Sequence, residues 1–304
     1  MISAKPSVFV IILNWNGKDY LNDCLFTISN QTYPNYKVVL VDNGSTDDSV
    51  EFVKKNYPHV TIIELDRNYG FSKGNNIGIE YALKKGADYV LLLNNDTVVK
   101  ENFLEELVLV AENNNAGICG PKIFFWNLNG RNDIIWFAGG YANVDKGKFY
   151  HYRIGKPDMK KEEIREVDFI SGCCILIKKD VFKKIGLLDE VYSPVYCEDI
   201  DFCLRAKKAG FKILYNSKAV VWHKVSATSK GAFSSRKAYF KYRNTIILIR
   251  KHGKLTIRNL MNVLIDAVLY SHGSFKTDKR DFLYTPFKIL KGILDGIKME
   301  LKRL

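Results

Sequence analysis

The stretch Tyr89-Val-Leu-Leu-Leu-Asn94-Asn95-Asp96-Thr97 is a continuous apolar run that stops abruptly at two amides and one carboxylate. Four to eight apolar residues between polar ones are typical of a strand that is buried on both faces of a sheet. In an open α/β sheet, ligands bind at the carboxyl ends of such strands. The run therefore predicts a central strand with Asp96 at the rim, where a carboxylate suits a hard cation that carries phosphate. The alternative is that Asn94–Asp96 only opens a turn or caps the helix that starts near Glu101.

Strand-like and helix-like segments alternate around this stretch. The expected strands, which are apolar and β-branched runs, lie at residues 8–13, 36–41, 60–65, 89–93 and 117–121. The expected helices, which have apolar residues at helical spacing, lie at residues 20–29, 48–57, 72–84 and 101–113. Ser45 or Thr46 would cap the second of these helices. Repeated strand–helix–strand units predict an α/β fold with a mostly parallel central sheet flanked by helices.

The pattern loosens after Pro121. Residues 122–166 are rich in Gly, Asn, Lys and aromatic residues without a sustained period, which is typical of a functional lid or substrate loop. Further strands are expected at 167–178, interrupted at Ser171-Gly172, and at 212–215 and 219–222, with helices at 179–185, 199–209, 236–251, 255–271 and 282–304. We therefore divide the chain into an α/β domain at 1–228 and a basic helical C-terminal extension at 229–304. The domain has a regular first half at 1–121 and a less regular second half at 122–228.

Composition restricts the class of protein. The chain has 304 residues, of which 47% are hydrophobic and 26% charged, which is typical of a globular protein with a substantial core. Its six cysteines form no CxxC pair, no secretory signal peptide is recognisable, and no apolar run reaches the roughly 18 residues that span a bilayer. These features predict a cytoplasmic location.

The net charge of +13 is concentrated at the C-terminal end. Residues 226–304 hold 17 Lys and Arg against 5 Asp and Glu, or +12, whereas residues 1–225 hold 29 against 28. The last expected helix sets apolar residues such as Ile289 and Ile293 against lysines. It either packs on the body of the protein or lies on an anionic membrane surface, and apolar helices here would also suit a homodimer. We expect no nucleic-acid partner, because the chain has charge but no recognised nucleic-acid module.

Polar residues follow each of the first four expected strands. They form the groups Asn14-Trp-Asn16-Gly17, Asp42-Asn43-Gly44, Asp66-Arg-Asn68-Tyr-Gly70 and Asn94-Asn95-Asp96. Parallel strands would bring these ends to one edge of the sheet, where amides and carboxylates can bind a base and a ribose and glycines permit close backbone approach. Neither GxGxxG nor GxxxxGK[ST] is present, so the site differs from the common dinucleotide and P-loop motifs. The alternative is a set of ordinary turns.

A second polar cluster begins at Glu198-Asp199-Ile-Asp201. Asp199 is either a helix cap or a general base, because a carboxylate oriented by its neighbours can accept a proton near neutral pH. The i,i+4 spacing of Asp201 and Arg205 predicts a structural ion pair. His223, at the end of an expected strand, is either a structural residue or a metal ligand, depending on whether the fold brings it to Asp96.

The order of these motifs resembles family 2 glycosyltransferases of the GT-A fold, and within them the bacterial rhamnosyltransferase-type branch. The resemblance covers about residues 7–225 and a short motif at Tyr242-Arg-Asn244. It rests on Val10–Gly17, Val41–Asp47, Asn68–Phe71, Asn94–Asp96, Ser171-Gly172, Glu198–Asp201 with Arg205, and Trp222-His223. It implies an inverting enzyme that moves a sugar from a nucleotide-diphosphate sugar, dTDP-rhamnose first and a UDP-sugar second, to a hydroxyl of a glycan or lipid-linked glycan in cell-surface polysaccharide synthesis.

The resemblance implies a catalytic domain at 1–228, with a nucleotide-binding half at 1–121 and an acceptor and catalytic half at 122–228. It also implies residue roles. Asp96 and His223 would hold Mn²⁺ or Mg²⁺, and Asp199 would be the catalytic base, with Glu198 beside it. The donor would be bound by Asn14, Asn16, Asp42, Asn43, Asn68, Gly70, Asn94, Asn95 and Asp96, with Asp42 reading the base. Asn94 stands where the family's Asp-x-Asp motif has its first carboxylate, so it can bind a ribose but brings no charge to the metal.

Two other classes stay open on the residues alone. A nucleotidyltransferase that makes nucleotide sugars also uses a nucleotide-binding α/β sheet, but we find no Gly-rich phosphate loop near the N-terminus. A catalytically silent subunit that binds sugar nucleotides would share the fold, and the presence of Asp96, Asp199 and His223 argues against it.

Overall fold

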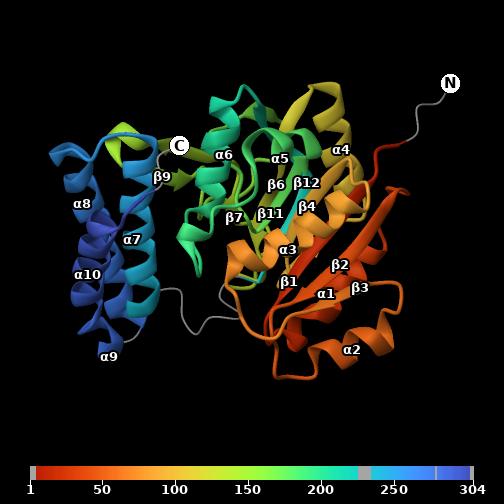
Figure 1. Cartoon of the computed structure of the whole chain (residues 1–304), viewed down its shortest axis with the longest axis horizontal. Coiled ribbons are helices and arrows are strands. Elements are labelled where there is room, and N and C mark those ends of the chain that lie inside the picture. The colour runs from red at the N-terminus through yellow and green to blue at the C-terminus, as the bar shows by residue number, and fades with distance from the viewer. Residues whose placement is uncertain (1–4, 225–233, 278, 302–304) are drawn as a thin grey trace.

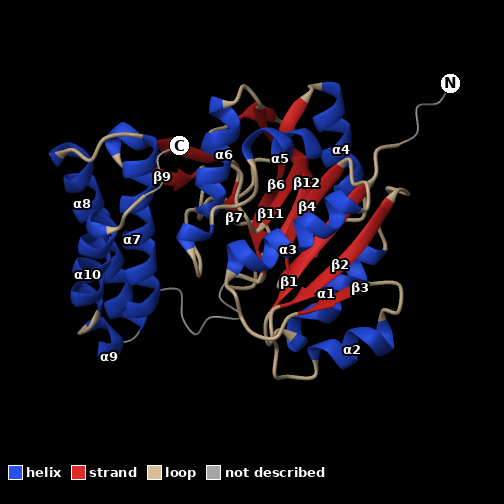
Figure 2. Ribbon diagram, viewed as in Figure 1, coloured by secondary structure: helices blue, strands red, loops and turns tan. Residues whose placement is uncertain are grey.

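The structure is a computed structural model that describes residues 5–224, 234–277 and 279–301, without the side chains of 276–280. Figure 2 shows a central layer of strands flanked by helices, and Figure 1 shows that the last helices of the chain stand as a separate group beside this layer. The predicted α/β fold is confirmed, and its central sheet is mixed.

The first four expected strands form the parallel part of the sheet. They are β1 (Val8–Asn14), β2 (Tyr36–Asp42), β3 (Thr61–Glu64) and β4 (Tyr89–Asn94), in the spatial order β4-β1-β2-β3. β1 and β4 are buried on both faces, which explains their continuous apolar sequence. Their register places Asn14 beside Asp42 and Leu13 beside Asn94. The predicted alignment of polar strand ends at one edge is confirmed.

The second half of the sheet is mixed. It contains β5 (Thr97–Val99), β6 (Ala116–Phe125), β7 (Ile135–Phe137), β10 (Ile164–Glu166), β11 (Cys174–Lys178) and β12 (Lys212–His223). β11 runs antiparallel between β4 and β6, and β12 runs parallel to β6. β5 is a short strand that pairs antiparallel with the end of β12, so that Thr97 lies opposite His223.

Helices cover the sheet, and two glycines of α3 allow close packing of that helix on β1. The helices of the domain are α1 (Lys18–Ser29), α2 (Ser49–Asn56), α3 (Phe71–Lys84), α4 (Phe103–Asn113), α5 (Lys179–Ile185) and α6 (Glu198–Lys208), with 3₁₀ turns at Val144–Lys146 and Glu190–Tyr192. A Cβ at Gly74 or Gly78 would lie 2.5 Å from Leu13 or 2.4 Å from Ile11. α3 therefore approaches β1 more closely than a helix with larger residues there could.

Three expectations about the second half were wrong. The predicted interruption at Ser171-Gly172 is confirmed as a turn, but the strand expected at 167–178 is limited to β11, and the part before the turn forms only an isolated bridge at Phe169. The two strands expected at 212–215 and 219–222 are one strand, β12, whose register shifts between Asn216 and Val220. A bulge of this kind interrupts the sequence pattern without ending the strand. Residues 122–166 are not one irregular loop, since they include β7 and a hairpin of β8 (Gly140–Asn143) and β9 (Lys148–His151).

The expected cap of α2 was also wrong. Asp48 precedes α2, whereas the Ser45 hydroxyl donates to Asp42 Oδ1 at 2.6 Å. Nor does the Asn94–Asp96 group cap a helix: Asn95 and Asp96 form the turn between β4 and β5, and α4 begins only at Phe103.

The extension consists of α7 (Ser235–His252), α8 (Ile257–Thr277), α9 (Lys279–Phe282) and α10 (Thr285–Lys298). α10 packs along α7, where a Cβ at Gly292 would lie 2.5 Å from the Tyr239 carbonyl oxygen. The predicted domain boundary at 228 and 229, and the last residues of the final expected helix, lie outside the described residues. In the part of the chain that the structure covers, no helix combines the length and apolar character needed to cross a bilayer.

Candidate active site

A cavity of about 830 Å³ lies at the carboxyl ends of β1, β2 and β4. Six of the residues predicted to bind the donor line it, namely Asn43, Asn68, Gly70, Asn94, Asn95 and Asp96. They end or follow β2, β3 and β4, which are distant in sequence and end at the same edge of the sheet. The turn-only alternative therefore does not account for these residues, because their side chains share one cavity.

Asn14 and Asp42 lie beneath this cavity and not on its wall. Both are buried, and the Asn14 amide donates to Asp42 Oδ1 at 3.0 Å. Asn95 in turn donates to Asn14 Oδ1 at 2.8 Å, and the Ser45 backbone N–H donates to Asp42 Oδ2 at 2.9 Å. These bonds join the ends of β1, β2 and β4 into one network.

The loop before α3 is shaped by amides. Asn43 donates to Asn68 Oδ1 at 3.0 Å, and Asn68 Oδ1 also accepts from the Gly70 N–H at 2.8 Å. Gly70 has φ +83°, and a Cβ there would lie 2.7 Å from Ser193 Oγ. Asn16 has a different position: it is exposed, outside the cavity lining, and its carboxamide oxygen accepts from the Thr46 N–H at 2.7 Å.

Asp96 and His223 meet at the rim because β5 pairs with β12. The register sets His223 opposite Thr97, which brings Asp96 Oδ1 to 3.2 Å from His223 Nε2. Both side chains are almost fully buried. Within the described residues, Asp96 Oδ1 has only the His223 ring as its polar neighbour, and His223 Nδ1 has no hydrogen-bond partner. Buried polar atoms without partners are rare, and an ion that binds there is one explanation of them.

The two side chains fit a divalent cation. Adjacent ligands of an octahedral Mg²⁺ or Mn²⁺ at about 2.1 Å lie about 3 Å apart, close to the separation of these atoms. Burial lowers the pKa of His223, but Cys173 and Asp96 outweigh burial and raise the pKa to about 10. A cation bound here would displace that proton. No group of three His, Cys, Asp or Glu gathers for a metal in the described part of the chain, so further ligands would come from the donor's phosphates and water.

Behind His223 lies an aromatic layer that the sequence did not reveal. The His223 ring meets the edge of Trp136 with 4.7 Å between centroids, and Trp136 meets His151 at 4.8 Å. Trp136 comes from β7 and His151 from β9, both in the segment that had been expected to be a loop. This packing fixes the orientation of the imidazole.

Asp199 lies in the first turn of α6, after the helix has begun at Glu198, so it is not the cap. Its carboxylate accepts from the backbone N–H groups of Gly172 and Ile200, each at 2.8 Å. Burial raises the pKa of Asp199, and these two hydrogen bonds lower it by less. Burial and the Asp199 charge raise the pKa of Glu198 well above its ordinary value. A raised pKa makes the Asp199 carboxylate a stronger proton acceptor than an exposed aspartate.

Neither Asp199 nor Glu198 lines the cavity directly. The link is Phe71, which lines it: a Cβ at Gly172 would lie 3.3 Å from the Phe71 ring and 3.5 Å from the Asp199 Cβ. Gly172 is therefore a neighbour of both Asp199 and the Phe71 ring that lines the cavity.

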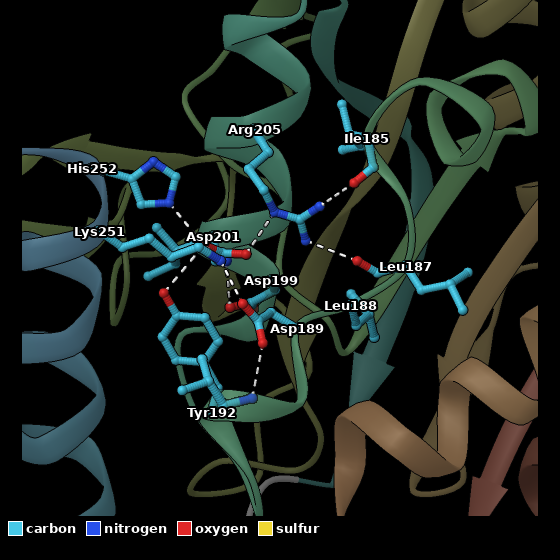
Figure 3. A network of polar contacts seen from close by, with 12 residues as sticks. Ile185, Leu187, Leu188, Asp189, Tyr192, Asp199, Asp201, Arg205, Lys251 and His252 are labelled. Atoms are coloured by element: carbon cyan, nitrogen blue, oxygen red, sulfur yellow. Dashed lines mark hydrogen bonds and ion pairs between the residues drawn. The ribbon is translucent and has the colours of Figure 1, made fainter. Parts of the chain in front are cut away.

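Asp201 has a structural role (Figure 3). It is fully buried and accepts from Arg205 Nε at 2.8 Å and from the Tyr192 hydroxyl at 3.1 Å, which confirms the predicted ion pair. Lys251 Nζ and His252 Nε2, both at the end of α7, also lie 2.8 Å from it. Burial raises the pKa of Asp201, but these partners lower it by more.

Other residues of the cavity carried no usable signal in the sequence. Trp15 is a half-exposed aromatic directly after β1, and only its position past a buried strand marked it. Ser193–Tyr196 and the α7 residues Arg236, Lys237 and Phe240 also line the cavity. They come from segments whose approach to the strand ends depends on tertiary packing.

Comparison with known proteins finds similar glycosyltransferases. The chain is 27% identical to "dTDP-rhamnosyl transferase RfbF" of Shigella flexneri, over 97% of this chain and 96% of that one. It is 27% identical to "N-acetylglucosaminyl-diphospho-decaprenol L-rhamnosyltransferase" of Mycobacterium tuberculosis, over 80% of this chain and 85% of that one.

Among solved structures, GalNAc-T7 with UDP, GalNAc and Mn²⁺ superimposes with a TM-score of 0.65 at 17% identity, over 82% of this chain and 48% of that one, which shows a shared fold. The sequence profile described as "Glycosyl transferase family 2" matches residues 9–186. This match spans more than half of the sequence, and the relatives that agree with it include named rhamnosyltransferases. The chain belongs to glycosyl transferase family 2.

Proposed function

We propose that this glycosyltransferase moves a sugar from a nucleotide-diphosphate sugar to a hydroxyl group of a glycan or lipid-linked glycan, with inversion at the anomeric carbon. The observation that carries the proposal is the meeting of Asp96 and His223 at the rim of a cavity lined by strand-end amides. That arrangement suits the binding of a diphosphate together with a cation.

In this mechanism Asp199 is the general base. It takes the proton of the acceptor hydroxyl as that oxygen attacks the anomeric carbon from the face opposite the diphosphate, and a single displacement inverts the centre. The raised pKa of Asp199 supports this role, as do the Gly172 and Ile200 N–H groups that fix its orientation. General-base assistance contributes about 10²–10⁴-fold in rate.

Asp96 and His223 would hold the cation, either Mn²⁺ or Mg²⁺, and the imidazole favours Mn²⁺. When bound, the cation neutralises charge on the diphosphate leaving group. The chain's own part is to present one carboxylate oxygen and one ring nitrogen from a dry, fixed position, since Trp136 packs against His223. Asn94 lines the cavity and is available to the ribose.

For the donor we propose dTDP-rhamnose, with UDP-sugars second, because the relatives named above are rhamnosyltransferases. The name of the mycobacterial relative describes an acceptor sugar that is linked through a diphosphate to decaprenol. This name supports the proposal of a lipid-linked acceptor for the present chain. The test is a panel of nucleotide sugars with and without Mn²⁺. Hydrolysis of one donor that requires Mn²⁺ supports the proposal. Release of pyrophosphate from nucleoside triphosphate and sugar phosphate would indicate a nucleotidyltransferase, and binding without turnover a silent subunit.

We further propose a cytoplasmic location on the inner face of the cell membrane, with α8 and α10 on the bilayer. In α10, Ile289 and Ile293 pack into the bundle, but Phe287 is 74% exposed, and in α8 Val268 and Leu269 are 70% and 67% exposed. A groove of about 670 Å³ lies between these helices. Large exposed apolar side chains that gather on neighbouring helices indicate an interaction site.

The charges on this surface favour anionic lipid over a second copy. Lys288, Lys291 and Lys298 lie on exposed positions of α10, whereas Asp266 and Asp295 are bound by Lys241 and Tyr239. A homodimer through this surface would bring like charges together, but an anionic bilayer attracts them.

Flotation of the full chain with phosphatidylglycerol vesicles tests the membrane contact. The double variant Leu269→Glu/Phe287→Glu should lose flotation, while Phe26→Glu, which alters an apolar residue that is 61% exposed on α1, should keep it. Equal flotation by all three proteins would exclude this surface. A wild-type dimer that dissociates in the double variant, without flotation, would support the homodimer instead.

A further inference from the structure

The motif Tyr242-Arg-Asn244 lies in the middle of α7, where it holds the loop that leads to the proposed base. Asn244 is fully buried, and its amide donates to the carbonyl oxygens of Tyr192, Val195 and Tyr196 at 2.7, 2.8 and 3.0 Å. One side chain of the extension thus binds three carbonyl groups of a single loop.

Arg243 completes this contact. Its guanidinium donates to the Ser193 carbonyl oxygen, and its Nε donates to Asn244 Oδ1 at 2.8 Å. The second bond fixes the Asn244 amide with its NH₂ group toward the loop. Together the two side chains bind four of the five carbonyl groups between residues 192 and 196.

The held loop is strained directly before the catalytic helix. Tyr196 and Cys197 have φ values of +81° and +72°, in the left-handed region that residues with a Cβ rarely adopt. Such conformations persist only where the surroundings fix them. The next residues are Glu198 and Asp199, so any relaxation of the loop moves the start of α6 and the Asp199 carboxylate with it.

The same loop forms part of the cavity. Pro194 lines it, and its carbonyl oxygen accepts from the Phe71 N–H at 2.8 Å. The loop therefore connects the donor cavity with the base. At the far end of α7, Lys251 and His252 bind Asp201 of α6, so α7 supports the catalytic segment at two points (Figure 3).

We propose that Arg243 and Asn244 are positioning residues of the transfer reaction, which hold the strained loop 192–197 and thereby the Asp199 carboxylate. Helix α7 is then part of the catalytic unit and not an appended segment. The inference rests on the proposed role of Asp199 as base.

Kinetics test the proposal in the full chain with Asn244→Ala and a matched control, Asn259→Ala. Asn259 is an equally buried asparagine of the extension, but it bonds to Thr256 and Lys254 and not to the loop. With dTDP-rhamnose, or the nucleotide sugar that the panel turns over fastest, Asn244→Ala should lower kcat about 100-fold, within the range of general-base assistance. Its affinity for dTDP with Mn²⁺ should stay within about threefold, since no dTDP-binding residue is removed. The acid limb of its pH–rate profile should also shift to lower pH, because better solvation of a freed Asp199 lowers the pKa of its carboxyl group.

Asn259→Ala should keep kcat within about twofold, although both variants lose a buried amide of similar stabilising value. A kcat near wild type in Asn244→Ala, or an equal loss in Asn259→Ala, would overturn the inference. Asp199→Asn separates the two proposals: normal transfer by that variant contradicts the proposed function itself, whereas its loss together with normal transfer by Asn244→Ala contradicts only the positioning role.

Hydrogen exchange gives a readout that does not depend on turnover. Amides of residues 197–201 should exchange faster in Asn244→Ala and at the wild-type rate in Asn259→Ala, and unchanged exchange in Asn244→Ala would overturn the inference. If Asn244→Ala does not fold, Arg243→Gln serves in its place, because it removes the bond to Ser193 and leaves Asn244 in the core.

Discussion

Replacement of Asp201 by asparagine tests the account of the network in Figure 3. Asp201 is fully buried and is the shared partner of Arg205, Lys251 and His252. Removing one partner of a buried ion pair costs about 3–5 kcal/mol, because the remaining charge stays buried without compensation.

The lower end of that range applies here. Lys251 keeps Asp189 at 2.6 Å, and Arg205 keeps the carbonyl oxygens of Ile185 and Leu187 at 2.7 and 2.9 Å. We therefore expect Asp201→Asn to lower the free energy of unfolding by about 3 kcal/mol. In chains somewhat smaller than this one, each kcal/mol of lost stability lowers Tm by about 2–4 °C, so Tm should fall by about 6–12 °C.

The assay is urea unfolding at pH 7, followed by circular dichroism, with Asp133→Asn as the matched control. Asp133 pairs with Arg131 at 2.7 Å, but both side chains are more than half exposed, so its loss should cost less than about 1 kcal/mol. A loss of unfolding free energy below about 1 kcal/mol for Asp201→Asn, or an equal loss for the two variants, would refute the reasoning.

The same network sets a pH dependence. The pKa of Asp201 is lowered in the folded chain, so its stabilising contribution is fully present above the ordinary aspartate pKa of about 3.9 and is lost as pH falls below it. Unfolding free energies of wild type and Asp201→Asn should therefore differ at pH 7 and converge as pH falls below about 4.

Four further outcomes follow from the site. Asp199→Asn should fold normally and lose about 10²–10⁴-fold in kcat, and near-normal transfer would contradict its role as base. Asp96→Ala should abolish the strengthening of dTDP binding by Mn²⁺ in calorimetry, and the same Mn²⁺ effect as in wild type would rule out its role as metal ligand. Because burial raises the pKa of Asp199, kcat/KM should fall with decreasing pH at a value above the ordinary aspartate pKa of about 3.9, and an acid limb at or below that value would count against the assignment. Gly70→Ala should lower the free energy of unfolding by about 1–3 kcal/mol through backbone strain, and it should also weaken dTDP binding. The control Gly86→Ala has the same kind of backbone conformation, with φ +85°, but nothing within 4 Å of its Cβ, so it should lose stability and keep its affinity for dTDP.

The sequence predicted the parallel half of the fold correctly because its signals are local. A strand buried on both faces must be apolar throughout, as β1 and β4 are, and it must then end at polar residues. Parallel pairing sends all such ends to one edge, so the meeting of Asn43, Asn68 and Asp96 at one cavity followed from pattern and topology together.

The second half was less predictable because its strands depend on distant partners. β12 was expected as two strands, since the bulge between Asn216 and Val220 breaks the alternation on which the prediction depends. The hairpin β8–β9 has no sustained apolar period, and its stacked Tyr141 and Tyr150 are informative only once the two strands are paired.

By itself, the sequence determined the identity of the chemical groups and the sheet edge at which they gather. Only the tertiary structure decided which groups touch: β5 pairs with β12 and brings His223 to Asp96, and α7 returns to hold the loop before Asp199. The physical reason is that a strand end is fixed by hydrophobic burial of its own residues, whereas these contacts join segments far apart in sequence. Their register is set by hydrogen bonds and packing that exist only in the folded chain.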